Sequence, residues 1–172
     1  KGQDVLLRAL PAVLADHPDA VAVLVGEATD DKGRRYRAEL EALVAELGIG
    51  GRVRFAGARR DVADVLAAAE VVVHCSTTPE PFGRVVVEAM AAGRPVIAAD
   101  AGGVPEIVDA ERTGLLVAPG DPEALAAAVG RLLDDPEATA ELGRRAGEAV
   151  AARFTIDGPA LAHLAAVLGD GG

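Results

Sequence analysis

Five short apolar segments alternate with longer stretches of helical periodicity along this chain, and this alternation constrains its fold more than any other feature. The apolar segments cover residues 20–26, 52–57, 70–75, 94–100 and 113–120. Short, nearly continuous runs of valine, isoleucine and leucine are typical of strands buried in parallel sheets. Strands that alternate with helices build such a sheet with helices on both faces. We therefore predict an α/β fold, with a doubly wound, mainly parallel, Rossmann-like sheet.

The remaining stretches carry the apolar spacing and the end signals of helices. We expect helices over residues 4–18, 30–48, 61–70, 84–93, 104–110, 121–135, 136–153 and 157–168. Pro11 is expected to split or kink the first of these helices. Asp121 is suited to an N-cap and Pro122 to the first helical position. The predicted order is therefore a helix first, and then strands and helices in turn.

That order is unusual, because a doubly wound domain begins with a strand. In the common strand order 3-2-1-4-5-6, the first strand is central. If that first strand is missing, a gap remains between its two neighbours, the second and fourth strands of that order. We expect residues 1–172 to form one domain of a longer protein, in which preceding residues supply the missing strand. The alternative is a five-stranded variant that closes the gap.

Composition and charge exclude several classes of partner and compartment. The 172 residues carry a formal net charge of −10, which argues against binding nucleic acid through bulk charge. The single cysteine, Cys75, cannot form an internal disulfide, and its apolar surroundings favour a core position. No apolar run is long enough to span a bilayer. We expect a cytoplasmic protein, and we leave open a peripheral position of the full-length protein at the inner face of the membrane.

Two glutamates lie eight positions apart, on either side of a predicted turn between a strand and a helix. Glu80 precedes the turn, and Glu88 lies within the apolar helix RVVVEAMAAG. A carboxylate that such a helix buries is costly unless it is hydrogen-bonded. The two hydroxyls of a ribose are natural donors to Glu88. The alternative is an ion pair of Glu88 with Arg84, one turn away.

The turn itself, Pro81-Phe82-Gly83, leads into the start of that helix. Ligands of open α/β sheets bind at the carboxyl ends of the strands, where this turn lies. A helix start offers unpaired N–H groups that bind phosphate. We expect Gly83 to let a ligand approach the backbone. The amides of Gly83, Arg84 and Val85 are candidates to bind one anion.

The segment from Glu80 to Glu88 resembles the E-x7-E region of retaining GT-B glycosyltransferases of the family 4 group. The stretches KGQDVLLRAL, RFAG, EAMAAGRPVIAADAGGVPEIV and TGLLVAPGDPEALAAAV resemble the same family in the same order. Together they cover essentially the whole chain, as the C-terminal, donor-binding domain of a two-domain enzyme. The resemblance implies a retaining hexosyltransferase that takes a nucleotide-diphosphate sugar as donor. The domain alone would be inactive, because the absent N-terminal domain mainly holds the acceptor.

The same resemblance implies roles for individual residues. Glu80 would contact hydroxyls of the donor sugar beside the reacting centre, and Glu88 would bind the ribose. Lys1 would neutralise the diphosphate of the leaving group. The family's partner arginine lies upstream of Lys1 and is absent from this chain. Further donor contacts are implied for Phe82, Gly83, Arg84 and Val85, and contacts to the base for Ala58, Arg59 and Arg60.

The resemblance also implies a front-face reaction with retention of configuration, no cofactor and no obligatory metal. The acidic pairs Asp30-Asp31 and Asp134-Asp135 flank helices, which favours solvated caps over metal ligands. Two features stay open at this point. His74 is either a satisfied residue at a strand end or a sugar contact. Gly102 and Gly103 form either a ligand-facing helix start or a tight turn.

Three other functions compete with sugar transfer. One is another GT-B enzyme, such as a nucleotide-sugar epimerase, and the spacing of the two glutamates speaks against it. Another is a non-catalytic nucleotide-binding module. A dinucleotide oxidoreductase is the weakest alternative, because no G-x-G-x-x-G follows a predicted strand. The sequence does not specify the donor sugar, the base or the acceptor.

Overall fold

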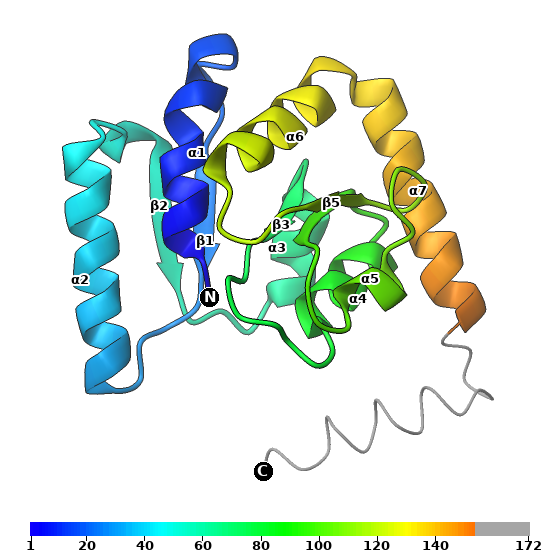
Figure 1. Ribbon diagram of the computed structural model, residues 1–172, viewed down its shortest axis with the longest axis horizontal. Helices are drawn as coiled ribbons and strands as arrows, with labels where there is room; N and C mark the ends of the chain where they lie inside the picture. Colours follow the sequence, from blue (N-terminus) through cyan, green and yellow to red (C-terminus); the bar gives the residue numbers. More distant parts are fainter. Residues whose placement is uncertain (154–172) are drawn as a thin grey trace.

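A computed structural model describes residues 1–153 as an alternation of helices and parallel strands (Figure 1). The strands are β1 (Ala22–Val25), β2 (Val53–Gly57), β3 (Val72–His74), β4 (Val96–Ala99) and β5 (Leu115–Val117). The helices are α1 (Gln3–Asp16), α2 (Asp31–Glu46), the 3-10 turn η1 (Gly50–Arg52), α3 (Val62–Ala68), α4 (Arg84–Ala91), α5 (Val104–Ile107), α6 (Pro122–Asp134) and α7 (Pro136–Arg153). The predicted order of elements is confirmed, except that the helix expected over 157–168 lies outside the described residues.

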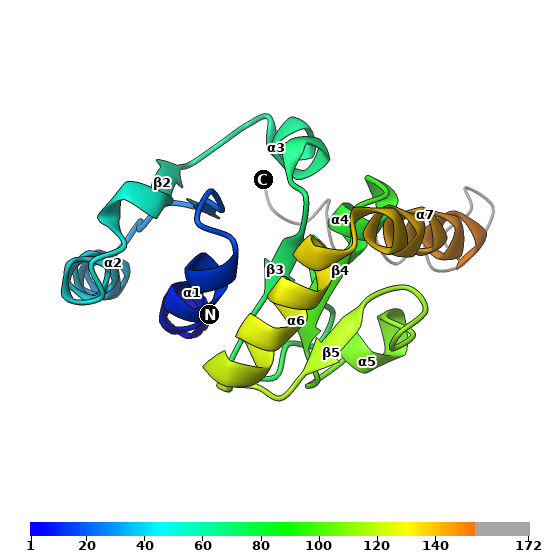
Figure 2. The ribbon, with the colours of Figure 1, turned by 90° about the horizontal axis from the view of Figure 1, so that it is seen from above.

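The five strands form two parallel sheets instead of one. The pair β1–β2 forms the first sheet, and the second has the order β3-β4-β5. Figure 2 shows the two groups of strands apart, and no hydrogen bond of a sheet joins β1 to β3 within the described residues. The interruption falls where the order 3-2-1-4-5-6 has its first strand. The parallel α/β fold is confirmed, and the alternative of a closed five-stranded sheet is wrong.

Strand β4 is the centre of the larger sheet, and its side chains alternate between two apolar clusters. All four of its residues are buried. Val96 and Ala98 join a cluster with residues of α3, α4 and α7. Ile97 joins a different cluster, with residues of α1, α6 and α7. Helices therefore cover both faces of this sheet, as the continuous apolar run predicted.

The pair β1–β2 differs, because the described helices cover only one of its faces. Leu24 and Phe55 pack against residues of α1 and α2. Val21, Val23 and Val25 are exposed on the opposite face. The prediction that β1 is buried on both faces is therefore wrong for the part of the chain that the structure describes. Within residues 1–153, no helix covers the face of β1 that carries these valines.

Helix ends follow the capping signals of the sequence. Asp30 accepts a hydrogen bond from Gly33 N, and Asp121 accepts one from Ala124 N. Asp135 accepts one from Ala138 N at the start of α7. Pro11 lies inside α1 without ending the helix. Within residues 1–153, no helix is long and apolar enough to cross a membrane.

Helix α7 packs on α4 through glycines, which bring α7 against the backbone beyond the end of α4. A Cβ atom built on Gly143 would lie 2.3 Å from the carbonyl oxygen of Gly93. Gly143 is buried within α7. Neither backbone can move away without opening the apolar cluster between the two helices. Gly143 is therefore required by packing and not by backbone conformation.

We expect Gly143→Ala to lower the free energy of unfolding by about 1–3 kcal/mol, because the added methyl group overpacks the contact. Gly130→Ala is the matched control, since Gly130 also lies inside a helix and a Cβ there has no neighbour within 4 Å. That substitution should raise stability by about 0.5–1 kcal/mol through helix propensity. Urea denaturation measures both changes. Equal effects of the two substitutions would contradict the packing role of Gly143.

Candidate functional site

The candidate site is built where β3 and β4 end and α1 and α4 begin. The loop after β3 contains Glu80 and leads through Gly83 into α4. Lys1 lies two residues before the start of α1, and this helix packs against α6 over the larger sheet. Sites in parallel α/β folds form at this carboxyl edge, because the loops there emerge side by side. The structure therefore brings together Lys1 and Glu80, which are 79 positions apart.

Lys1 and Glu80 are in direct contact, as an ion pair in which Lys1 Nζ donates to Glu80 Oε1. The lysine side chain is exposed, whereas that of Glu80 is only 22% exposed. Lysine forms its ion pairs as a flexible point charge, so it can exchange one anion for another. The Lys1 ammonium is thus held beside Glu80, and its side chain remains exposed.

The start of α1, and with it Lys1, is fixed by a hydrogen bond between helices. Tyr36 of α2 donates its hydroxyl hydrogen to Asp4 Oδ1 at 2.8 Å. Burial and the neighbouring Asp4 carboxylate raise the pKa of Tyr36 to about 12. The hydroxyl therefore stays protonated and keeps donating at neutral pH. This contact anchors the first turn of α1 beside the site.

Glycines permit the loops of the site to meet backbone against backbone. A Cβ atom on Gly102 would lie 2.2 Å from the Glu80 carbonyl oxygen, and one on Gly103 would lie 2.2 Å from that of Pro81. Gly103 N donates to Glu80 O at 2.9 Å. A Cβ on Gly2, which has a φ of 79°, would lie 1.8 Å from the carbonyl oxygen of Cys75. Gly102 and Gly103 form a tight turn that leads into α5 and supports Glu80, and the alternative of a ligand-facing helix start stays a prediction.

The first amides of α4 lie directly after this supported loop. The first hydrogen bond of the helix runs from Val86 N to Gly83 O at 2.9 Å. The amides of Gly83, Arg84 and Val85 precede it, and helix geometry provides them with no intrahelical acceptor. These are the three amides that the sequence singled out. The Phe82 side chain packs against the apolar cluster of α4 and β4.

Gly83 has a packing role that the sequence did not indicate. A Cβ atom on Gly83 would lie 2.9 Å from Val104 Cγ2 at the start of α5. The sequence predicts that this glycine gives a ligand close access to the backbone. The structure shows a second reason, because α5 occupies the space where a larger side chain would extend.

Glu88 forms the ion pair that the sequence left as the alternative. Arg84 Nε lies 3.2 Å from Glu88 Oε1, and the glutamate side chain is 40% exposed. The expectation that the apolar helix buries this carboxylate is therefore wrong. Glu88 lies on a partly exposed side of α4, and a solvated ion pair there contributes little to stability. Its carboxylate is accessible to a polar ligand.

The residues predicted to contact a base lie in the loop after β2. Arg59 forms an ion pair with Asp61, with Nε donating to Oδ1 at 2.8 Å. Ala58 and Arg60 are exposed in the same loop. This loop follows the carboxyl end of its strand, as the loop with Glu80 does. None of these residues contacts Glu80, Lys1 or Glu88 through the ion pairs and hydrogen bonds of residues 1–153.

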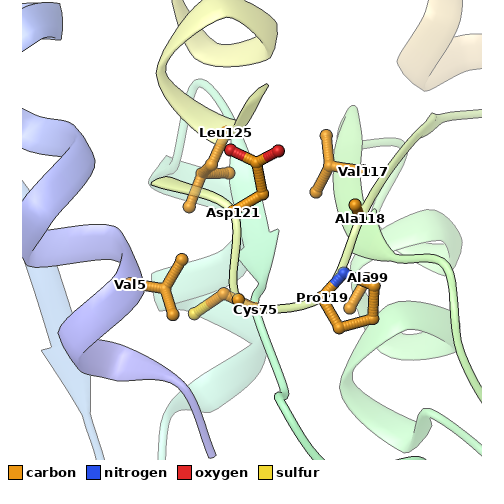
Figure 3. A pocket seen from close by; sticks show the side chains of 9 residues that line it. Val5, Cys75, Ala99, Val117, Ala118, Pro119, Asp121 and Leu125 are labelled. Carbon is orange, nitrogen blue, oxygen red and sulfur yellow. The ribbon is translucent and has the colours of Figure 1, made fainter. Parts of the chain in front are cut away.

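A small cavity lies beside the site, between α1, the ends of the three strands of the larger sheet and the start of α6 (Figure 3). Its lining consists of Val5, Cys75, Ala99, Val117, Ala118, Pro119, Gly120, Asp121 and Leu125. The volume of about 10 Å³ corresponds to one water molecule.

The environment of Cys75, which lines this cavity, disfavours a reactive thiol. Burial raises the pKa of the Cys75 thiol, so the thiolate that a nucleophile needs is disfavoured. The expectation that Cys75 packs rather than reacts agrees with this environment.

Opposing effects act on the carboxylate of Glu80. Burial by itself would raise its pKa, but the hydrogen bond and positive charge of Lys1, together with the nearby His74 ring, outweigh burial and lower it below 4.5. His74 ends strand β3 with its Nε2 atom 3.4 Å from Glu80 Oε2. Glu80 is therefore ionised at neutral pH and surrounded by donors.

Comparisons with known proteins agree with this geometry. The sequence profile described as "Glycosyl transferases group 1" matches residues 1–149. The chain belongs to this family, and its fold is the α/β, Rossmann-like fold of GT-B glycosyltransferases. Over 158 residues it is 40% identical to a D-inositol 3-phosphate glycosyltransferase of Corynebacterium kroppenstedtii. That alignment covers 90% of this chain and 35% of the relative, so the chain spans about a third of the relative's length.

Solved structures show the same fold. The crystal structure of Anabaena HepE in complex with UDP-glucose matches with a TM-score of 0.85 and 38% identity, over 98% of this chain and 45% of that one. The C-terminal domain of a group 1 glycosyl transferase, LpcC of Francisella tularensis, matches with a TM-score of 0.83 and 29% identity. That match covers 91% of this chain and 81% of the LpcC domain. The chain thus corresponds in fold to a C-terminal domain of the family.

We expect Lys1→Met to raise the pKa of Glu80, because burial then acts against fewer positive charges. Carbon-13 NMR of the glutamate carboxyl groups measures this pKa. Since the pKa in the folded chain lies below 4.5, the pair stabilises the fold above pH 4.5, and its contribution is lost as the pH falls through the folded-state value. The destabilisation by Lys1→Met should therefore fade in acid.

The control is Lys32→Met, which removes the other lysine of the chain from an exposed position in α2. It should leave the titration of Glu80 unchanged. If Lys1→Met also leaves it unchanged, the ion pair does not exist in solution.

Proposed function

We propose that this chain is the donor-binding half of a retaining glycosyltransferase of the family 4 group. In this proposal it binds a nucleotide-diphosphate sugar, and the full-length enzyme moves the sugar to an acceptor. The observation that carries the proposal is the contact between Lys1 and Glu80 at the carboxyl edge, beside the first amides of α4. A cation, a helix start and a carboxylate there match the phosphate and hydroxyl groups of such a donor.

The charges of the reaction assign a role to each group. Cleavage of the bond between the anomeric carbon and the diphosphate places negative charge on phosphate and positive character on the sugar. Lys1 and the amides of Gly83, Arg84 and Val85 stabilise the negative charge on the phosphate, as preorganised donors do in other sites. Glu80 is ionised, and it orients the sugar and stabilises the positive character that develops on it. Glu88 exchanges Arg84 for the hydroxyls of the ribose.

The likeness to HepE, whose crystal contains UDP-glucose, supports a sugar nucleotide as the ligand. In this proposal the loop of Ala58, Arg59 and Arg60 faces the base, and the backbone of Phe82 contacts the sugar and diphosphate. A front-face reaction requires that the acceptor approach from the same side as the leaving group. We assign the acceptor mainly to the remainder of the full-length enzyme, so this chain alone binds the donor and does not transfer the sugar.

Calorimetry with UDP, GDP, ADP and NAD tests the proposed donor site. We expect one nucleoside diphosphate to bind selectively, and Glu88→Ala to weaken its binding by about 1.5–3 kcal/mol, the scale of a hydrogen bond to a charged group. Glu41→Ala is the matched control, because Glu41 also pairs with an arginine one turn earlier, Arg37, on α2. It should leave the affinity unchanged.

Selective binding of NAD, or equal losses from Glu88→Ala and Glu41→Ala, would contradict the assignment of the ribose site. In the full-length enzyme, Glu80→Ala should abolish transfer. Unchanged transfer would instead support a nucleotide-binding module without catalysis.

A further inference from the structure

Among the described residues, His74 is a buried ionisable side chain that has no role in the proposed function. It is the last residue of β3, where it pairs with Ala98 of β4, and its side chain is 7% exposed. Both ring nitrogens are buried, and neither has a hydrogen-bond partner of normal geometry within residues 1–153. A buried polar side chain without partners is costly. Such a group in a rigid strand calls for a functional reason.

The ring is directed at Glu80. His74 Nε2 lies 3.4 Å from Glu80 Oε2, whereas Glu80 Oε1 accepts from Lys1. The two oxygens of the Glu80 carboxylate thus face two different side chains, Lys1 before α1 and His74 at the end of β3. The backbone of Glu80 is fixed separately, because its carbonyl oxygen accepts from Gly103 N.

The distance of 3.4 Å is longer than a normal N–H···O bond, so a small rotation of the carboxylate is needed to close the bond. Lys1 holds the carboxylate from the other side. Hydrogen bonds of catalytic groups are often long without substrate and shorten when substrate binds. A ligand phosphate that takes over Lys1 would release Glu80 Oε1 and leave His74 as the neighbouring donor to Glu80.

We propose that His74 is a positioning residue, which donates from Nε2–H to Glu80 and holds its carboxylate toward the donor sugar once the diphosphate engages Lys1. The inference rests on the proposed function. In this proposal His74 acts through Glu80 and not directly on the sugar or the reacting atoms. It fixes the direction in which the ionised carboxylate acts.

The surroundings select one form of the imidazole ring. Nδ1 has no acceptor among the described residues, so a hydrogen on Nδ1 would be buried without a partner. A lone pair on Nδ1 avoids that cost, and Nε2 then carries the hydrogen that points at Glu80. A lone pair on Nε2 would also face the negative Glu80 Oε2, so this geometry favours the Nε2–H tautomer.

Nitrogen-15 NMR of the histidine rings tests this contact without any ligand. We expect the Nε2–H tautomer for His74 and a clear shift of its ring resonances in Glu80→Gln. His17, whose Nε2 lies 3.2 Å from Asp134 far from the site, provides the internal reference and should not respond. The Nδ1–H tautomer, or an unchanged His74 spectrum in Glu80→Gln, would overturn the proposal.

Two substitutions separate positioning from folding. Glutamine places an amide N–H at the distance of Nε2, whereas asparagine reaches only the position of Nδ1. We expect His74→Asn to weaken binding of UDP-glucose or GDP-mannose about tenfold, as loss of a hydrogen bond to a charged group would. Binding of free UDP or GDP, which lacks the sugar, should stay unchanged. His74→Gln should restore the affinity for the sugar nucleotide to within about twofold of the wild-type value.

Equal losses for the sugar nucleotide and the free diphosphate would show a structural role and overturn the proposal. So would equal affinities of His74→Asn and the wild-type chain. If the wild-type chain binds neither form, the proposed function fails, and the NMR result still decides whether His74 orients Glu80.

Discussion

The candidate site depends on a contact between two backbones. The loop that carries Glu80 lies against the turn of Gly102 and Gly103, close enough that a single Cβ atom on either glycine would collide with a carbonyl oxygen. A hydrogen bond from Gly103 N to Glu80 O joins the two loops. Since one loop follows β3 and the other follows β4, the sheet itself determines where Glu80 lies. Lys1 and His74 then act on a carboxylate whose backbone is already fixed.

The proposed function requires an acidic protein to bind an anionic ligand, and this arrangement is suited to that. The net charge of the chain is −10, and it contains only two lysines, of which one is Lys1. The amides at the start of α4 add partial positive charge without a charged side chain. Local geometry, and not overall charge, therefore sets the potential at the site. Because the chain has so few lysines, each hydrogen-bond donor near Glu80 matters for the potential there.

The sequence predicted the order of the elements, the parallel pairing and the edge of the sheet where the site lies, because apolar periodicity and capping residues are local signals. The sequence did not predict burial and contacts that depend on segments far apart in the chain. The apolar run of β1 indicated burial on both faces, and no pattern within that run reports a missing neighbour. The exposure of Glu88 depends on where α4 meets the rest of the fold. The meeting of His74 with Glu80 depends on the shape of a loop of five residues, which no periodicity describes.

The unpaired edge of β1 has a consequence for the behaviour of the chain in solution. Its backbone groups on that side have no strand partner within residues 1–153, and Val21, Val23 and Val25 are exposed beside them. An apolar strand with a free edge is a template for pairing with strands of other molecules. Repulsion between copies that each carry a charge of −10 opposes such pairing, and salt screens that repulsion. Where no preceding strand fills this edge, we expect ionic strength to shift the balance between dispersed chains and strand-mediated aggregates.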